Sequence, residues 1–176
     1  MISKHERKAI IDLIRSQVVP AIGCTEPIAV ALCVAKARAT LGAVPESVTL
    51  HLSANILKNA MGVGIPGTGM IGLPIAVALG ALIGRADLGL EVLRDCNKKA
   101  VAQGRKFIDE GRINIQLETT DKDKLFINAV VSADGHEAEA TIRGGHTNFV
   151  FLRRDADVLL DRKGCEAAAI ENGGVE

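Results

Sequence analysis

The stretch A-V-V-S-A-D-G-H-E-A-E-A-T-I-R, residues 129–143, has the pattern of two antiparallel strands joined by a tight turn. The Asp134-Gly135 pair is a strong signal for a two-residue hairpin, because both residues tolerate the positive φ angles that such a turn requires. After the turn, apolar and polar residues alternate, as in a strand with one buried face. The apolar set is Ala138, Ala140 and Ile142, and the polar set is Glu137, Glu139 and Thr141.

The same two-residue periodicity predicts further strands on both sides of this hairpin. They are Ile113–Glu118, Leu125–Val131, Thr147–Arg153 and, much earlier in the chain, Ser47–Ser53. Before Gly111 the apolar residues instead recur mainly at helical spacing. Helices are predicted at Ser3–Val19, at Glu26–Leu41, at Leu73–Ile83, and from a cap at Asp87 to near Gly111.

We therefore expect an α+β fold, in which N-terminal helices pack on a mainly antiparallel sheet that ends in a C-terminal β-meander. The amphipathic Ser3–Val19 helix and the apolar helix that begins near Pro27 should both cover one face of this sheet. The chain has 176 residues, enough for one domain, which we place at residues 1–160. Residues 161–176 have little to bury and are expected to form a tail or linker.

The composition argues against several classes of function. Lys plus Arg and Asp plus Glu each number 21, and Trp and Tyr are absent, so no nucleic-acid partner is expected. The uncharged run 60–84 is interrupted by prolines and glycines, which argues against a membrane span. The charged N-terminus lacks the apolar core of a signal peptide, which favours a cytoplasmic protein.

The four cysteines are spread along the chain: Cys24, Cys33, Cys96 and Cys165. No two of them form a C-x-x-C pair, so no metal site is expected in this chain alone. Cys33 and Cys96 fall on apolar helical faces and are expected in the core, whereas Cys165 lies in the predicted tail.

Cys24 differs from the others, because G-C-T-E-P at residues 23–27 places it where Pro27 predicts the start of a helix. The positive end of the helix dipole favours a thiolate there. The charge of Glu26 opposes this effect, so a functional thiol and a structural thiol both remain open.

Two further motifs combine glycine with polar side chains. Residues 67–72 match G-x-G-x-x-G, which fits a dinucleotide loop, a tight turn that exposes backbone amides to a small anion, or a structural loop. G-G-H-T-N at residues 144–148 places an imidazole, a hydroxyl and an amide just after a strand. These groups can line a polar pocket, or they can be satisfied within the turn itself.

Three motifs, taken in order and spacing, resemble a known family. They are G-C-T-E-P-I-A at 23–29, K-N-A-M-G-V-G-I-P-G-T-G-M-I-G-L-P at 58–74, and G-G-H-T-N at 144–148. The chain resembles the serine dehydratase-like α family, and more closely its L-cysteine desulfidase branch, as far as about Arg162. The resemblance implies a lyase that uses an iron–sulfur cluster to convert L-cysteine or L-serine into pyruvate, ammonia and sulfide or water.

The resemblance also implies roles for individual residues. Cys24 and Glu26 match catalytic positions, and the residues that match substrate-binding positions are Thr25, Asn59, Thr68, His146, Thr147 and Asn148. Family members are more than twice as long as this chain, and their cluster-binding cysteines lie in a second half. We therefore expect no cofactor in this chain alone, a small amino acid as substrate, and the cluster-bearing half as partner in cis or in trans. A non-catalytic binding or regulatory module remains an alternative, and assembly into a homo-oligomer remains open.

Overall fold

The computed structural model describes residues 3–17 and 23–162, so the predicted tail from residue 163 onward lies outside the described residues. The helices are α1 (Lys4–Gln17), α2 (Thr25–Leu41), α3 (Ala54–Met61), α4 (Leu73–Leu82), the 3-10 helix η1 (Ala86–Glu91) and α5 (Lys98–Asp109). The strands are β1 (Ser47–Leu52), β2 (Gly64–Ile65), β3 (Met70–Ile71), β4 (Ile113–Leu117), β5 (Phe126–Ala133), β6 (His136–Arg143), β7 (Phe149–Arg154) and β8 (Asp157–Asp161).

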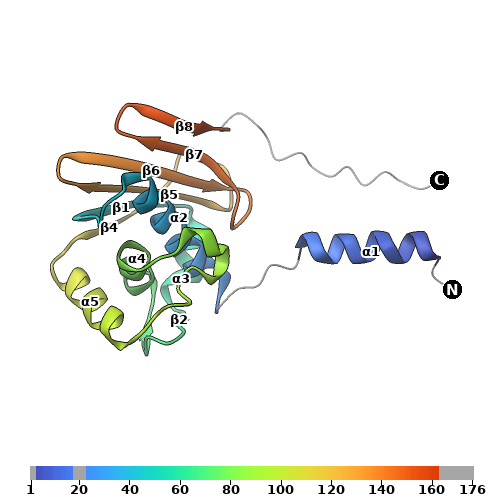
Figure 1. Cartoon of the computed structure of the whole chain (residues 1–176), viewed down its shortest axis with the longest axis horizontal. Helices are drawn as coiled ribbons and strands as arrows, with labels where there is room; N and C mark the ends of the chain where they lie inside the picture. Colours follow the sequence, from blue (N-terminus) through green and yellow to red (C-terminus); the bar gives the residue numbers. More distant parts are fainter. Residues whose placement is uncertain (1–2, 18–22, 163–176) are drawn as a thin grey trace.

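Six strands form one sheet in the order β4-β1-β5-β6-β7-β8 (Figure 1). Neighbouring strands are antiparallel except for β1 and β4, which run parallel with Leu50 opposite Ile115. Strands β5 to β8 follow one another in the chain and form the expected meander. At its first turn Asp134 and Gly135 have φ angles of 51° and 77°, as the predicted hairpin requires. The α+β fold class is confirmed.

Helix α2 lies at the centre of the molecule because its sequence is apolar on nearly every side. It packs on β5 and β6 and also on α4, while α5 packs against α4 (Figure 1). Ile28 and Leu32 are each 1% exposed, and burying a side chain of this size stabilises the fold by about 1.5–3 kcal/mol. The close approach of α4 depends on Gly80, where a Cβ would lie 2.6 Å from the backbone oxygen of Ala31.

The predicted packing of the first helix on the sheet was wrong. In α1 the side chains of Ile10 and Ile14 are 46% and 52% exposed. The physical reason is that α2 already covers the apolar face of the sheet at β5 and β6.

The single helix predicted from Asp87 to Gly111 was also wrong. Gly89, with φ 54° and ψ −129°, interrupts the helical backbone within η1. Asn97 rather than Asp87 caps α5, because its Oδ1 accepts a hydrogen bond from the Ala100 amide over 3.0 Å. Sequence periodicity also did not predict α3 and β8, which are short.

The apolar run of residues 73–82 forms the buried helix α4. Within residues 3–17 and 23–162, no helix is both long enough and apolar enough to cross a membrane.

Candidate functional site

The candidate site is built on the N-terminus of α2, where Cys24 occupies the N-cap position. Its backbone is extended, with φ −68° and ψ 135°, and its side chain makes no capping hydrogen bond to the helix. Instead the Cys24 thiol donates a hydrogen bond to Oε2 of Glu26 over 3.1 Å. Cys24, Thr25 and Glu26 are all half-buried. The two residues that match catalytic positions are therefore in direct contact.

Gly23 brings this end of the helix against the glycine-rich loop of residues 62–72. Its φ of 94° lies in a region that residues with a Cβ rarely adopt. A Cβ at this position would also lie 2.7 Å from Cγ of Pro66, closer than real atoms approach. The contact between Gly23 and Pro66 was not anticipated from the sequence, because nothing in either segment indicates the other as its neighbour.

The carboxylate of Glu26 joins segments that are far apart in the chain. Its Oε1 accepts a hydrogen bond from Nδ2 of Asn59, which projects from α3, over 3.4 Å. His146, in the turn between β6 and β7, lowers the pKa of this carboxylate electrostatically. All three motifs that carry the family resemblance therefore contribute a group to the surroundings of Glu26.

The pKa shifts of Cys24 and Glu26 show which of the two side chains carries the proton. The hydrogen bond from Cys24 lowers the pKa of Glu26 most, and the Asn59 amide and the charge of His146 lower it further. Burial raises the pKa of the Cys24 thiol, and its hydrogen bond to Glu26 raises it again. At neutral pH the site therefore holds a protonated thiol beside a carboxylate, and the thiolate that a helix end favours is absent from this arrangement.

The loop that matches G-x-G-x-x-G forms a small hairpin between β2 and β3. Thr68 is 7% exposed, and its hydroxyl donates to the Ile65 oxygen over 2.6 Å and accepts from the Met70 amide over 2.9 Å. The loop follows α3 and not a strand of a parallel βαβ unit, which argues against the dinucleotide alternative. Thr68 supports the turn, and ligand contact by its hydroxyl remains a prediction.

The G-G-H-T-N motif forms the turn between β6 and β7. Asn148 holds the turn together. Its side-chain Nδ2 donates to the backbone oxygen of Arg143 over 2.8 Å, and its backbone N–H donates to the backbone oxygen of Gly145 over 3.0 Å. Thr147 is exposed and His146 is half-buried, so both can be reached from solvent. Of the three polar residues in this motif, His146 is the one that contributes to the lowered pKa of Glu26.

The cysteines differ in environment. Cys33 is fully buried, as predicted, and its thiol donates to the Ala140 oxygen over 3.3 Å, while burial raises its pKa strongly. Cys96 is half-buried just before α5, so its predicted place on a helical face was wrong, although it packs against the core from there. Cys165 lies outside the described residues. In the described part of the chain no three His, Cys, Asp or Glu side chains converge as a metal site would require.

Several curated bacterial proteins are similar to this chain. A UPF0597 protein of Bacteroides thetaiotaomicron is 62% identical over 160 residues, which covers 91% of this chain and 37% of that protein. A UPF0597 protein of Bacteroides fragilis is 62% identical over 161 residues, which covers 92% and 38% respectively. A UPF0597 protein of Oleidesulfovibrio alaskensis is 41% identical over 173 residues, which covers 98% and 40%.

The chain thus spans 37–40% of the length of these three relatives. The similarity extends over nearly all of this chain, including the residues around Glu26. No family model matches the chain, and no solved structure matches it.

Proposed function

We propose that this chain supplies the proton-handling site of a lyase that eliminates the β-substituent of a small L-amino acid. L-Cysteine and water would give pyruvate, ammonia and sulfide, and L-serine would give pyruvate and ammonia. The observation that carries the proposal is the contact of two separated motifs at Glu26, with a thiol and a carboxylate 3.1 Å apart and Asn59 on the same carboxylate. His146 of the third motif lowers the pKa of Glu26 electrostatically. The resemblance of the same motifs to the serine dehydratase-like α family supplies the reaction class.

An elimination of this kind begins with removal of the proton on Cα by a base. The electron pair of that C–H bond becomes the Cα–Cβ double bond, and the sulfur or oxygen on Cβ leaves with its own bonding pair. The resulting enamine takes up a proton at Cβ to become an imine, which water hydrolyses to pyruvate and ammonia.

Cys24 and Glu26 are arranged to move this proton. The Glu26 carboxylate accepts the hydrogen bond of the thiol, so a path for the thiol proton lies along that bond. The raised pKa of Cys24 and the lowered pKa of Glu26 keep the resting proton on sulfur. In this proposal the sulfur of Cys24 takes up the α-proton as its own proton passes to Glu26, so that no free thiolate is formed.

Neighbouring polar groups would bind the amino acid. His146 and Thr147 offer an imidazole and a hydroxyl for the substrate carboxylate, and Asn59 and Thr25 lie beside the catalytic pair. Thr68 and Asn148 would act mainly through the turns that they hold together.

An iron–sulfur cluster is implied by the family resemblance, and the described residues of this chain do not fit one. No three ligand-type side chains converge in residues 3–17 and 23–162, whereas clusters of this type are held by several thiolates. Residues outside the described part of the chain would therefore have to hold a cluster.

The proposal can be tested in a chimaera, because this chain is 62% identical to 37% of the Bacteroides thetaiotaomicron protein. The matching segment of that protein is replaced by this chain, and pyruvate, ammonia and sulfide are assayed anaerobically with L-cysteine and with L-serine. We expect turnover that falls at least about 100-fold in Cys24→Ser and in Glu26→Gln, as loss of a general acid–base group does. Cys96→Ser is the matched control and should stay close to the unsubstituted chimaera.

Two outcomes would overturn the proposal. If the chimaera forms pyruvate and Cys24→Ser leaves its rate unchanged, the assignment of the base is wrong. The second outcome is that neither the chimaera nor its parent converts either amino acid, while L-serine or L-cysteine still binds and shifts the NMR signals of Cys24 and Glu26. The site would then belong to a non-catalytic binding module.

A further inference from the structure

A second polar pocket lies on the other face of the sheet from α2. It has a volume of about 330 Å³ and is lined by residues of β1, β5 and β6, with Asn128 and Thr141 among its buried residues. These two alternate along their strands with core residues such as Ala129 and Ala140, so they face away from the helices. The segment between β4 and β5 closes one side, held by ion pairs from Arg143 to Asp121 and, at 3.0 Å, to Asp123.

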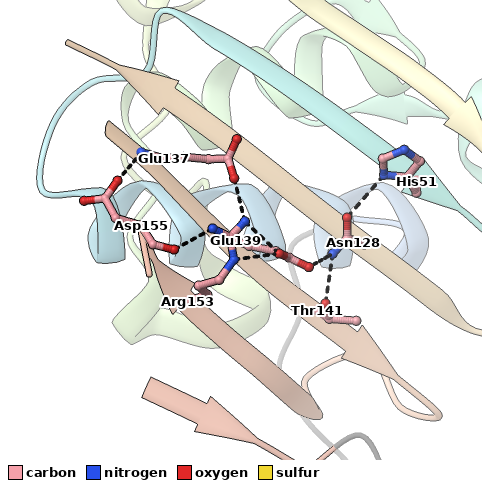
Figure 2. A network of polar contacts seen from close by, with 7 residues as sticks. All are labelled: His51, Asn128, Glu137, Glu139, Thr141, Arg153 and Asp155. Carbon is pink, nitrogen blue, oxygen red and sulfur yellow. Dashed lines mark hydrogen bonds and ion pairs between the residues drawn. The ribbon is translucent and has the colours of Figure 1, made fainter. Parts of the chain in front are cut away.

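A chain of hydrogen bonds fixes the orientation of the groups in this pocket (Figure 2). Nδ2 of Asn128 donates to Oε1 of Glu139 over 2.8 Å and to Oγ1 of Thr141 over 3.0 Å. Glu139 is held in turn by Arg153, whose Nε and Nη2 lie 3.2 Å and 3.1 Å from Oε2. Because its amide nitrogen is used in this way, Asn128 presents its Oδ1 to Nδ1 of His51, 3.2 Å away.

This arrangement leaves one acceptor, Nε2 of His51, and one donor, the hydroxyl of Thr141, without a hydrogen-bond partner among the described residues. Oδ1 of Asn128 is an acceptor, so the contact selects the tautomer of His51 in which Nδ1 carries the proton and Nε2 is an acceptor. Nε2 lies on the side of the ring away from Asn128 (Figure 2). Thr141 is 2% exposed and accepts from Asn128, so its hydroxyl proton must find another acceptor. Within the described residues neither side chain makes a further hydrogen bond.

The charge around the pocket restricts what can bind there. Three carboxylates (Glu118, Asp121 and Glu139) line it, against the guanidinium of Arg143 in the lining and that of Arg153, which pairs with Glu139 from outside it, so one negative charge is in excess. An anion would be repelled, and a cation would be attracted, because partly buried charges of this kind interact more strongly than charges in water. A volume of about 330 Å³ suits a small ligand.

We propose that this pocket binds a small primary amine that also carries a hydroxyl or carbonyl oxygen. Its ammonium group donates to Nε2 of His51 and faces the carboxylate of Glu118. Its oxygen accepts the otherwise unused hydroxyl proton of Thr141. The pocket is separate from the Cys24–Glu26 site, and the inference does not depend on the lyase proposal.

Ethanolamine is the test probe, titrated into the ¹⁵N-labelled 176-residue chain and followed by NMR. We expect saturable shifts at His51, Asn128 and Thr141, and an affinity that Thr141→Val weakens about 2–10-fold, as loss of one hydrogen bond does. His51→Phe should weaken binding similarly. His136→Gln is the matched control, because His136 pairs with Asp155 at the far end of the same hairpin.

Glycolate and L-serine complete the comparison, since glycolate is anionic and L-serine adds a carboxylate to the amine. Glycolate should not bind and L-serine should bind more weakly than ethanolamine. Equal affinities for ethanolamine and glycolate would overturn the proposal. So would an unchanged affinity in Thr141→Val, shifts that appear instead around Cys24 and His146, or no saturable shift at all, which would mean that water alone fills the pocket.

Discussion

Gly23 and Pro66 are in direct contact: a Cβ on Gly23 would lie 2.7 Å from Cγ of Pro66. The contact links the beginning of α2 to the hairpin that precedes α4. It also places Cys24 and Glu26 next to the loop on which the family resemblance partly rests.

We predict that Gly23→Ala lowers the free energy of unfolding by about 1–3 kcal/mol, the cost of holding a residue with a Cβ in a strained conformation. The φ of 94° disfavours alanine, and the clash with Pro66 adds to this. Urea unfolding measures the loss. Gly62→Ala is the control, because Gly62 has φ −100° and a Cβ there would meet nothing within 4 Å. Equal effects of both substitutions would show that the Gly23–Pro66 contact is unimportant.

The second prediction concerns the reactivity of Cys24. Its pKa is raised by burial and by Glu26, so less thiolate is present at a given pH than for an ordinary thiol. Glu26→Gln removes the charge that opposes ionisation, which should lower the pKa of Cys24 and speed its alkylation between pH 7 and 9, about the range in which thiols begin to ionise. Iodoacetamide labelling with peptide mass analysis measures the rate. Glu118→Gln is a charge-matched control, and a rate unaffected by Glu26→Gln would contradict the assignment.

The third prediction follows from the lowered pKa of Glu26, to which the hydrogen bond from Cys24 contributes most. A carboxyl group with a lowered pKa in the folded state stabilises the fold above its ordinary pKa of 4.5. That stability is lost as the pH falls through the folded-state value. Unfolding free energies of the wild type and Glu26→Gln should therefore converge towards acid pH. The difference at neutral pH should be at most about 1 kcal/mol, because the group is partly exposed; a constant difference across the pH range would be evidence against the shift.

The fourth prediction concerns the buried amide of Asn128, which is 8% exposed. Asn128→Leu keeps a similar volume but removes the donor to Glu139 and Thr141, and we expect a loss of about 1–3 kcal/mol, the cost of leaving buried polar groups unsatisfied. Thermal and urea unfolding measure it. Ser132→Ala on the same strand is the control. The Ser132 hydroxyl forms an exposed 2.7 Å hydrogen bond with Ser47, which should contribute little to the free energy of unfolding.

The fifth prediction tests the exposed position of α1. The double substitution Ile10→Ser with Ile14→Ser should change the free energy of unfolding by less than about 0.5 kcal/mol, as expected for exposed positions. Ile28→Ala in α2 should cost about 2–5 kcal/mol, because it leaves a cavity in the core. A large loss from the α1 substitutions would mean that this helix packs against the rest of the chain in solution.

The candidate site could be predicted from the sequence only in part. The residues Cys24, Glu26, Asn59 and His146 were all named from motifs, and the fold brings them together at Glu26. The sequence could not show that the Cys24 thiol would be protonated, because a pKa depends on burial and on neighbours supplied by the tertiary structure.

The second pocket was missed, although the alternation of β6 had already placed Glu139 and Thr141 on the polar face of their strand. A polar face usually points to water. Only the fold shows that the segment before β5 covers this face, so that Thr141 is 2% exposed.

The sequence by itself determined the local elements whose signals lie within a few residues. The Asp134-Gly135 hairpin, the apolar helix α2 and the alternating strand β1 follow from backbone geometry and side-chain periodicity. Only the tertiary structure decided which segments meet: the parallel pairing of β1 with β4, the exposed α1, and the contacts of Gly23 with Pro66 and of Glu26 with Asn59. The physical reason is that periodicity fixes which face of an element is apolar, whereas its partner is chosen by the packing of the whole chain.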